Sequence, residues 1–388
     1  MKIVHICPHS VYNDYWGYQD NLLSKYHRAL GHEVTIITNT KTYKNGKVVN
    51  VEPDDYVLKD GTRVIRKKYK KYPINALSTL YSRLEVYRLL KEIMPDFIFF
   101  HSVNSSTILD AVKYKKKINP NCVIVQDSHS DYFNSPIKKR LTAKMMREYY
   151  VWVNKRIRPY ISKVYGVTPW RKQYAEEVYK IPSSMTDVLI MGADDEYLKL
   201  DQKENIKNQI KEKYNIPENK FLIVTGGKID KKKKIDKLMR ACGKMDNAHL
   251  IVFGSLYDDI KEEFETALNS NSNITYIGWL DANDVYDYFM SADLVCFPGG
   301  HSVMWEQACA TKVPCLFEKF EGIEHLNNGG NSDFIENANE ENLEEKIKEL
   351  LFTEKYYKML KIAQSEKTDV YLYSKIAEKS LECARKIN

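Results

Sequence analysis

FLIVTGGKIDKKKKIDKLMRA, residues 221–241, combines a short apolar run, two glycines and a helix-length segment whose start is crowded with lysines. The run 221–226 is apolar without alternation, which is typical of a strand buried on both faces of a parallel sheet. We expect the strand to end at Gly226 and Gly227, the chain to turn there, and a helix to follow. A strand, a glycine turn and a helix in this order form the repeating unit of Rossmann-like folds.

The same alternation continues on both sides of this stretch, so the predicted fold class is α/β with two Rossmann-like domains. The other predicted strands are 2–7, 33–38, 62–67, 96–101, 122–127, 163–168, 249–254, 273–278, 294–299 and 314–319. A chain of 388 residues exceeds what one hydrophobic core usually serves. The predicted domains are 1–190 and 191–370, followed by a C-terminal helix, 371–388, that packs back on the first domain. We expect the two sheets to face a cleft at their carboxyl ends, where open parallel sheets bind ligands.

The net charge of +7 is unevenly distributed between the two halves. Residues 1–190 hold 32 Lys and Arg against 17 Asp and Glu, whereas residues 191–388 hold 27 against 35. The basic half is expected to meet a negatively charged surface or substrate. The seven cysteines lack the spacing of metal ligands or of a redox pair, which favours a reducing cytoplasm. We expect neither a signal peptide nor a membrane-spanning helix.

The lysines after the strand 221–226 form the first candidate phosphate site. Lys228 and Lys233 stand at the turn between strand and helix, where ammonium groups can neutralise a diphosphate. The alternative is that the run consists of solvated surface lysines.

The stretch PGGHSVMWEQACATKVP, 298–314, is the second candidate. The strand before it ends in two glycines, Ser302 is the expected N-cap, and the helix is predicted over 303–311. Free amides of Ser302 and Val303 at this helix start suit a phosphate. Glu306 lies about one turn further on, where its carboxylate can accept hydrogen bonds from a ribose diol; the alternative is an ordinary helix glutamate. Together the two turns predict a nucleotide-diphosphate site.

Two turns in the first half are also candidates. Gly17 opens a predicted helix, where it allows a close approach of backbone to ligand or simply packs the helix. The stretch 123–133 places Asp127, His129 and Asp131 in a loop after a strand end, a position that favours a functional role for His129 over a structural one.

In order and wording, these segments resemble glycosyltransferase family 4, the retaining GT-B enzymes that use nucleotide sugars, over nearly the whole chain. The glycine-opened helix and G-H-E-V-T strand of the family are similar to residues 17–38, and its histidine-containing loop is similar to residues 127–131. Its V-T-P-W and G-A-D phrases are similar to residues 167–170 and 192–194.

The resemblance implies a GT-B fold and a set of site residues. The family's G-R-L-x-x-x-K-G turn falls on Gly227, Lys228, Ile229 and Lys233, with lysine in place of arginine. Lys228 and Lys233 would bind the diphosphate and stabilise its departure, and His129 would hydrogen-bond the sugar near the reacting centre. The implied donor-binding residues are Gly17, Gly227, His301, Ser302, Val303 and Glu306. The resemblance implies no metal and no cofactor beyond the nucleotide-sugar co-substrate.

This chain departs from the family at one position. The family carries two glutamates eight positions apart, the first touching the donor sugar and the second the ribose. Glu306 is similar to the second, but Pro298 stands where the first belongs. The loop before the helix is shortened by about four residues relative to the family, so that His301 and the backbone after it remain to meet the sugar.

The function implied is a retaining glycosyltransferase that moves a sugar, with UDP as the preferred leaving nucleotide, to a lipid-linked or cell-surface polysaccharide acceptor. The alternatives are a non-catalytic GT-B partner subunit of an active transferase and a GT-B nucleotide-sugar epimerase. Basic stretches at 63–73, 113–120 and 137–159, the last rich in aromatic residues, predict a cytoplasmic protein peripheral at the inner face of an anionic membrane. Core packing explains those aromatic residues equally well. Nucleic acid is not an expected partner, because no recognised motif accompanies the charge.

Overall fold

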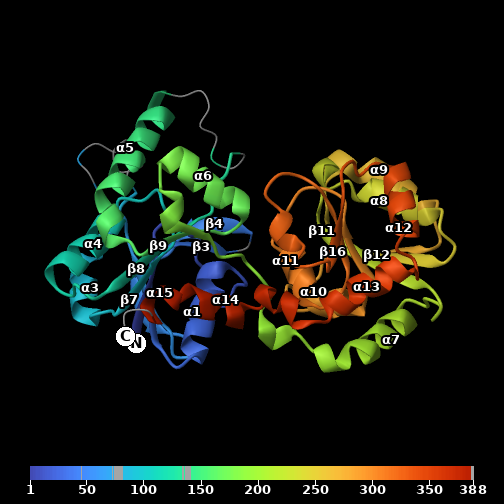
Figure 1. Ribbon diagram of the computed structural model, residues 1–388, viewed down its shortest axis with the longest axis horizontal. Helices are drawn as coiled ribbons and strands as arrows, with labels where there is room; N and C mark the ends of the chain where they lie inside the picture. The colour runs from blue at the N-terminus through green and yellow to red at the C-terminus, as the bar shows by residue number, and fades with distance from the viewer. Residues whose placement is uncertain (45, 72, 74–81, 133–134, 136–140, 386–388) are drawn as a thin grey trace. The chain divides into compact units, whose positions relative to one another are not determined.

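The computed structural model describes residues 1–388 except 45, 72, 74–81, 133–134, 136–140 and 386–388. The described chain divides into two compact units, residues 1–190 with 376–388 and residues 191–375. Each unit is built on one parallel-rich sheet flanked by helices (Figure 1). The α/β fold class predicted from the unbroken apolar runs is therefore confirmed.

The sheet of the first unit has the strand order β10-β9-β8-β7-β1-β2-β6-β5. Its neighbouring strands pair in parallel, except that β5 is antiparallel to β6. A separate antiparallel hairpin joins β3 to β4. The strands are β1 Lys2–Cys7, β2 Glu33–Asn39, β3 Lys41–Lys44, β4 Lys47–Asn50, β5 Asp54–Val57, β6 Arg63–Lys67, β7 Phe97–Phe100, β8 Val123–Ser128, β9 Lys163–Gly166 and β10 Thr186–Val188. The helices are α1 Gln19–Ala29, α3 Tyr87–Ile93, α4 Ile108–Lys117, α5 Leu141–Ile157 and α6 Pro169–Tyr179.

The sheet of the second unit has the order β13-β12-β11-β14-β15-β16, and all its neighbouring strands are parallel. Its strands are β11 Phe221–Ile229, β12 Ala248–Leu256, β13 Ile274–Tyr276, β14 Leu294–Phe297, β15 Cys315–Glu318 and β16 Ser332–Ile335. Its helices are α7 Lys203–Lys213, α8 Ile235–Gly243, α9 Lys261–Asn269, α10 Val285–Ser291, α11 Met304–Ala310, α12 Glu340–Lys348 and α13 Glu354–Ala363.

The last two helices, α14 Tyr373–Ser380 and α15 Glu382–Arg385, bring the chain back to the first unit, where they lie beside α1 (Figure 1). Ser380 Oγ lies 2.7 Å from Nε2 of His27 in α1, and Lys379 donates a hydrogen bond to the carbonyl of Val188. None of the described helices combines the length and the apolarity needed to cross a bilayer.

The strand β11 is longer than the sequence predicts. It does not end at Gly226 and Gly227 but continues to Ile229, paired with β12 along its whole length. Gly227 has a φ of 104° and pairs with Gly254, whose φ is 124°. A Cβ on Gly254 would lie 1.8 Å from the Gly227 carbonyl oxygen, so the two glycines allow the strands to stay together through a backbone conformation that other residues rarely adopt.

Candidate functional site

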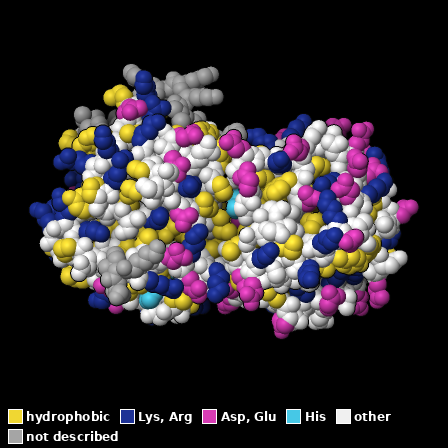
Figure 2. All heavy atoms as spheres, in the orientation of Figure 1, with side chains coloured by type: hydrophobic (Ala, Val, Ile, Leu, Met, Phe, Trp, Pro, Cys, Tyr) yellow, Lys and Arg dark blue, Asp and Glu magenta, His cyan; other side chains and the backbone are white. Residues whose placement is uncertain are grey.

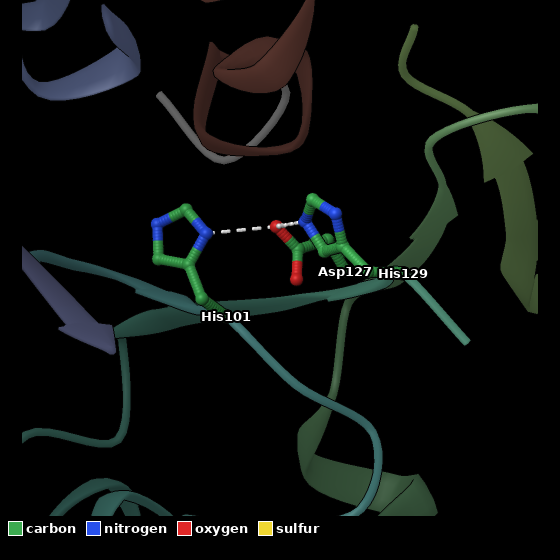
Figure 3. A group of neighbouring side chains, drawn as sticks. All are labelled: His101, Asp127 and His129. Carbon is green, nitrogen blue, oxygen red and sulfur yellow. Dashed lines mark hydrogen bonds and ion pairs between the residues drawn. The ribbon is translucent and has the colours of Figure 1, made fainter. Parts of the chain in front are cut away.

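Polar side chains gather where parallel strands of the first sheet end. His101 follows β7, and Asp127 and His129 lie at the end of β8, the strand paired with β7. His101 Nδ1 is 2.8 Å and His129 Nε2 is 3.4 Å from Oδ2 of Asp127 (Figure 3). Asp127 is completely buried, whereas the His129 side chain is 46% exposed. The predicted residue His129 is thus held by a buried carboxylate, with its ring open to solvent.

The charges in this group stabilise one another. Burial alone would raise the pKa of the Asp127 carboxyl, but His101 and His129 outweigh burial and hold that pKa well below its ordinary value. Burial also disfavours charge on His101, yet Asp127 outweighs it and raises the pKa of His101. A carboxylate that orients an imidazole is an arrangement suited to hydrogen bonding with, or proton transfer from, a substrate hydroxyl.

The other two candidates of the first unit differ in their surroundings. Gly17 is exposed just before α1, and a Cβ added there would meet no described atom within 4 Å, so no helix contact requires a glycine. Asp131 forms an ion pair with Arg171 of α6 at 3.2 Å, which gives it a structural partner.

In the second unit the two predicted turns pack against each other. The Lys233 ammonium donates a hydrogen bond to the carbonyl of Gly300. A Cβ on Gly299 would lie 2.4 Å from the carbonyl oxygen of Lys232, and one on Gly227 would lie 2.9 Å from the sulfur of Met304. The glycines predicted from the sequence therefore permit a close approach between the lysine turn, the 298–303 loop and the start of α11.

The two predicted lysines are not equivalent. The Lys228 side chain is 52% exposed, pairs with Asp230 at 3.2 Å and lies 4.4 Å from the centre of the Tyr257 ring. Lys233 is more deeply placed: burial lowers its pKa, and the neighbouring charge of Lys228 lowers it further, against the opposing effect of Asp230. A desolvated cation interacts more strongly with a phosphate than a solvated one does.

The start of α11 differs from the prediction. The helix begins at Met304, its N-cap residue is Val303, and that position provides no side-chain cap. Instead the Ser302 carbonyl accepts a hydrogen bond from the Trp305 amide at 3.0 Å. The expectation that Ser302 is the N-cap is wrong, because the helix begins one residue later than predicted and Val303 takes the N-cap position.

Glu306 is buried between two histidines. Its Oε1 lies 2.9 Å from Nε2 of His301 and 2.8 Å from Nε2 of His325. Burial alone would raise the pKa of Glu306, but the two imidazoles outweigh it and lower this pKa to about 2. His325 follows β15 and was not predicted, because it is 19 residues from Glu306 and belongs to no recognisable motif. His325 can be recognised as a partner of Glu306 only in the folded chain, where β14 and β15 lie side by side.

Each of the two histidine–carboxylate groups has the donor atoms of a metal site. His101, Asp127 and His129 each offer one donor atom within 4.8 Å of the others, as do His301, Glu306 and His325. In each group an imidazole nitrogen lies within hydrogen-bond distance of the carboxylate, and this bonding accounts for the short separations.

The low pKa of Glu306 has a consequence for acid stability. Since the folded-state pKa of about 2 lies below the unfolded value near 4.5, the ionised group stabilises the second unit fully above about pH 4.5. That stability, about 3 kcal/mol at most, is expected to be lost as the pH falls from about 4.5 toward 2. Denaturant unfolding of wild type and Glu306→Gln at pH 7, 4 and 3 measures it. A wild-type advantage that does not shrink with acid would contradict the assignment.

Comparisons with known proteins give the following matches. The family model described as Glycosyl transferases group 1 matches residues 206–367, and the family model described as Glycosyltransferase Family 4 matches residues 21–197. A glycosyltransferase from Rickettsia africae ESF-5 is 16% identical, with a TM-score of 0.69 over 100% of this chain and 98% of that one. Anabaena HepE in complex with UDP-glucose is 14% identical, with a TM-score of 0.66 over 100% of both chains. WaaG, a glycosyltransferase involved in lipopolysaccharide biosynthesis, is 16% identical, with a TM-score of 0.62 over 97% and 98%. No protein with a curated description matches the sequence.

Proposed function

We propose that this chain, which belongs to the group 1 and family 4 glycosyltransferases of GT-B fold, transfers a sugar with retention of configuration from a nucleotide-diphosphate sugar to a lipid-linked or cell-surface polysaccharide. The observation that carries the proposal is Lys233, a partly desolvated ammonium held at Gly300 between two glycine turns. UDP is the proposed leaving nucleotide, supported by the UDP-glucose bound to HepE. The involvement of WaaG in lipopolysaccharide biosynthesis supports the acceptor class.

The proposed roles follow from where charge develops. The bond from the anomeric carbon to the diphosphate oxygen breaks, a bond to the acceptor oxygen forms on the same face, and the acceptor proton passes to the departing phosphate. Lys228, Lys233 and the amides of Ser302 and Val303 compensate the growing negative charge. These cations and amides supply the compensation without a resident metal.

The sugar contacts are proposed to come from two histidines. His301, held by Glu306, replaces the glutamate that the family carries where Pro298 stands. His129 hydrogen-bonds the sugar near the reacting carbon, and its orientation comes from Asp127.

The test is nucleotide release by the purified chain from a panel of UDP- and GDP-sugars, with and without a membrane extract and with EDTA. Release from one UDP-sugar that rises with the extract and persists in EDTA is the expected result. Binding of nucleotide without turnover under every condition would overturn the proposed reaction and favour a non-catalytic partner, whereas loss of activity in EDTA would overturn the metal-independent step.

The helix α5 is proposed to contact an anionic membrane. Tyr150 and Val153 are buried in the core, but Met145 and Trp152 are 63% and 54% exposed. The Arg156 guanidinium lies 5.9 Å from the Trp152 ring. Figure 2 shows Lys and Arg side chains over the surface of the first unit, beside exposed hydrophobic ones. Residues 137–140 of the predicted basic stretch lie outside the described residues.

Substituting Trp152→Ser is expected to weaken binding to vesicles containing phosphatidylserine by about tenfold, because an interfacial aromatic ring is lost. Trp279→Ser is the matched control, since Trp279 is 69% exposed in the second unit. Cosedimentation measures both. Equal losses in the two variants would show that α5 is not the contact surface.

A further inference from the structure

A row of buried imidazoles runs from the C-terminal helix α14 to the group that holds His129. Ser380 Oγ is 2.7 Å from Nε2 of His27, and His27 Nδ1 is 3.0 Å from Nε2 of His5. His5 Nδ1 is 3.0 Å from Nε2 of His101, whose Nδ1 is 2.8 Å from Asp127. His5 and His27 are fully buried, and His101 is 8% exposed. These residues come from β1, α1, the end of β7, β8 and α14, so no local motif produces the row.

The donor in each hydrogen bond of the row follows from the single hydrogen of the Ser380 hydroxyl. The Ser380 hydroxyl has one hydrogen, which it donates to the Ala377 carbonyl at 2.8 Å, and a carbonyl oxygen can only accept. His27 Nε2 must then donate to Ser380, and its Nδ1 accepts from Nε2 of His5. In turn His5 Nδ1 accepts from Nε2 of His101. The protons on His101 Nε2, His5 Nε2 and His27 Nε2 therefore all point toward Ser380.

Both ring nitrogens of His101 act as hydrogen-bond donors. Its Nε2 donates to His5 and its Nδ1 donates to the Asp127 carboxylate, so both nitrogens carry protons and the ring is an imidazolium. With the opposite direction, the Ser380 hydroxyl would have to donate to His27, and the Ala377 carbonyl would lose its hydrogen bond from Ser380.

The pKa shifts of the three histidines agree with these protonation states. Burial holds the pKa of His5 well below its ordinary value and lowers that of His27 to about 3, so both are neutral. Asp127 overcomes burial and raises the pKa of His101, with a smaller contribution from Asp20.

The titratable groups that face the row, among the described residues, include His32, His129 and Cys7. His32 and His101 act against a proton on His27, and His27 and His101 act against one on His5. His129 shares Asp127 with His101. The thiol of Cys7 lies near both Asp20 and Asp127, and burial raises its pKa well above the ordinary value, so that it adds no charge.

We propose that this row is a positioning device for His129: the imidazoles of His27 and His5 hold His101 doubly protonated, and the His101–Asp127 ion pair fixes the His129 ring with Nε2 donating to Asp127. The second ring nitrogen of His129 then faces away from Asp127 (Figure 3). The role of His129 rests on the proposed transferase function, whereas the protonation states of the row do not.

The protonation states can be measured without activity. In the full chain labelled with ¹⁵N-histidine, two-bond ¹H–¹⁵N spectra between pH 6 and 8 are expected to show both His101 nitrogens protonated. His5 and His27 are expected to be neutral, with the proton on Nε2. A neutral His101 at pH 7, or a proton on Nδ1 of His5, would overturn the proposal whatever the enzyme does.

Two variants of one residue test the positioning role. In His5→Gln the amide oxygen can accept from His101 and the amide nitrogen can donate to His27, so kcat is expected within about threefold of wild type. In His5→Leu the row is cut, and kcat is expected to fall about tenfold or more with the donor KM within twofold, as for other groups that orient a functional histidine.

His249→Leu is the matched control, because His249 is a buried histidine of β12 hydrogen-bonded to Thr275 in the other unit. Its kcat is expected to stay within twofold of wild type after a comparable loss of Tm. Equal loss of kcat in His5→Leu and His249→Leu would show only destabilisation. An unchanged kcat in His5→Leu, with His101 shown to be neutral, would overturn the positioning role while leaving the transferase reaction intact.

Discussion

Replacing Glu306 by alanine is expected to lower kcat/KM for the nucleotide-sugar donor by roughly 100- to 1000-fold, the range found when one preorganised polar group is removed from an active site. The carboxylate is fully buried and accepts hydrogen bonds from His301 and His325. Its removal leaves two poorly exposed imidazoles without their acceptor and releases the His301 ring from its fixed orientation. The proposed contact of His301 with the sugar is lost with that orientation.

The controls separate this effect from unfolding. Glu306→Gln preserves the volume but presents an NH₂ group to one of the two imidazoles, so it is expected to lose at least about tenfold in kcat/KM with a smaller drop in Tm than alanine. Glu340→Ala removes a glutamate of the same unit that pairs with Arg240 and Lys244, and is expected to leave kcat/KM within twofold. A folded Glu306→Ala protein with kcat/KM within fivefold of wild type would contradict the proposed donor site.

Lys233→Met is expected to lower kcat by a similar factor, roughly 100- to 1000-fold, with little change in fold. The substitution keeps an unbranched side chain one atom shorter and removes the ammonium that the proposal places against the leaving diphosphate. Lys228→Met is expected to cost only about tenfold, because the Lys228 side chain is half exposed and its charge is screened by solvent. Steady-state measurements at saturating concentrations of the donor identified by the release assay give kcat for each variant.

The same lysine predicts a pH dependence. Burial lowers the pKa of Lys233 below its ordinary value of 10.5. Because the protonated form is the active one, wild-type activity is expected to be present at neutral pH and to fall, as the pH rises, earlier than an ordinary lysine would allow. This alkaline limb is expected to disappear in Lys233→Met.

The matched control for the lysine series is Lys231→Met. Lys231 belongs to the same run, but its side chain is 60% exposed and pairs with Glu263 at 3.6 Å. Its kcat is expected within twofold of wild type. If Lys231→Met and Lys233→Met lose the same activity, the run acts as a diffuse basic surface and the specific role of Lys233 is wrong.

The sequence predicted more of the Lys233 site than of the Glu306 site. Lys233, Gly227 and Gly300 were recognisable because strand, glycine turn and helix are neighbours along the chain, and local order is what a sequence displays most directly. Pro298, which stands where the family has its first glutamate, likewise shows in the sequence alone that this contact is missing. The proposed replacement for that contact is His301, which is held by Glu306. The sequence predicted His301 and Glu306, but it did not predict His325, the second histidine bonded to the carboxylate.

The sequence likewise predicted one part of the fold and missed another. The sequence alone determined that the chain forms two α/β units, because strands buried on both faces are read from unbroken apolar runs, as in β7 and in residues 221–224 of β11. It did not reveal β3, β4 or β5, which are short and carry exposed charged residues, nor β10 and β16, which are short strands at the edges of the two sheets. It also placed the end of β11 too early, since a glycine pair reads as a turn unless the partner Gly254 is known to lie opposite.

Only the tertiary structure decided which buried polar groups meet. His27 and Ser380 are 353 residues apart, and His5 and His101 are 96 apart, yet they form one hydrogen-bonded row. A sequence pattern reports whether a residue is buried, because hydrophobic periodicity is local. It does not report the partner, because a buried imidazole or carboxylate is satisfied by whichever group the packing of distant strands and helices brings within about 3 Å.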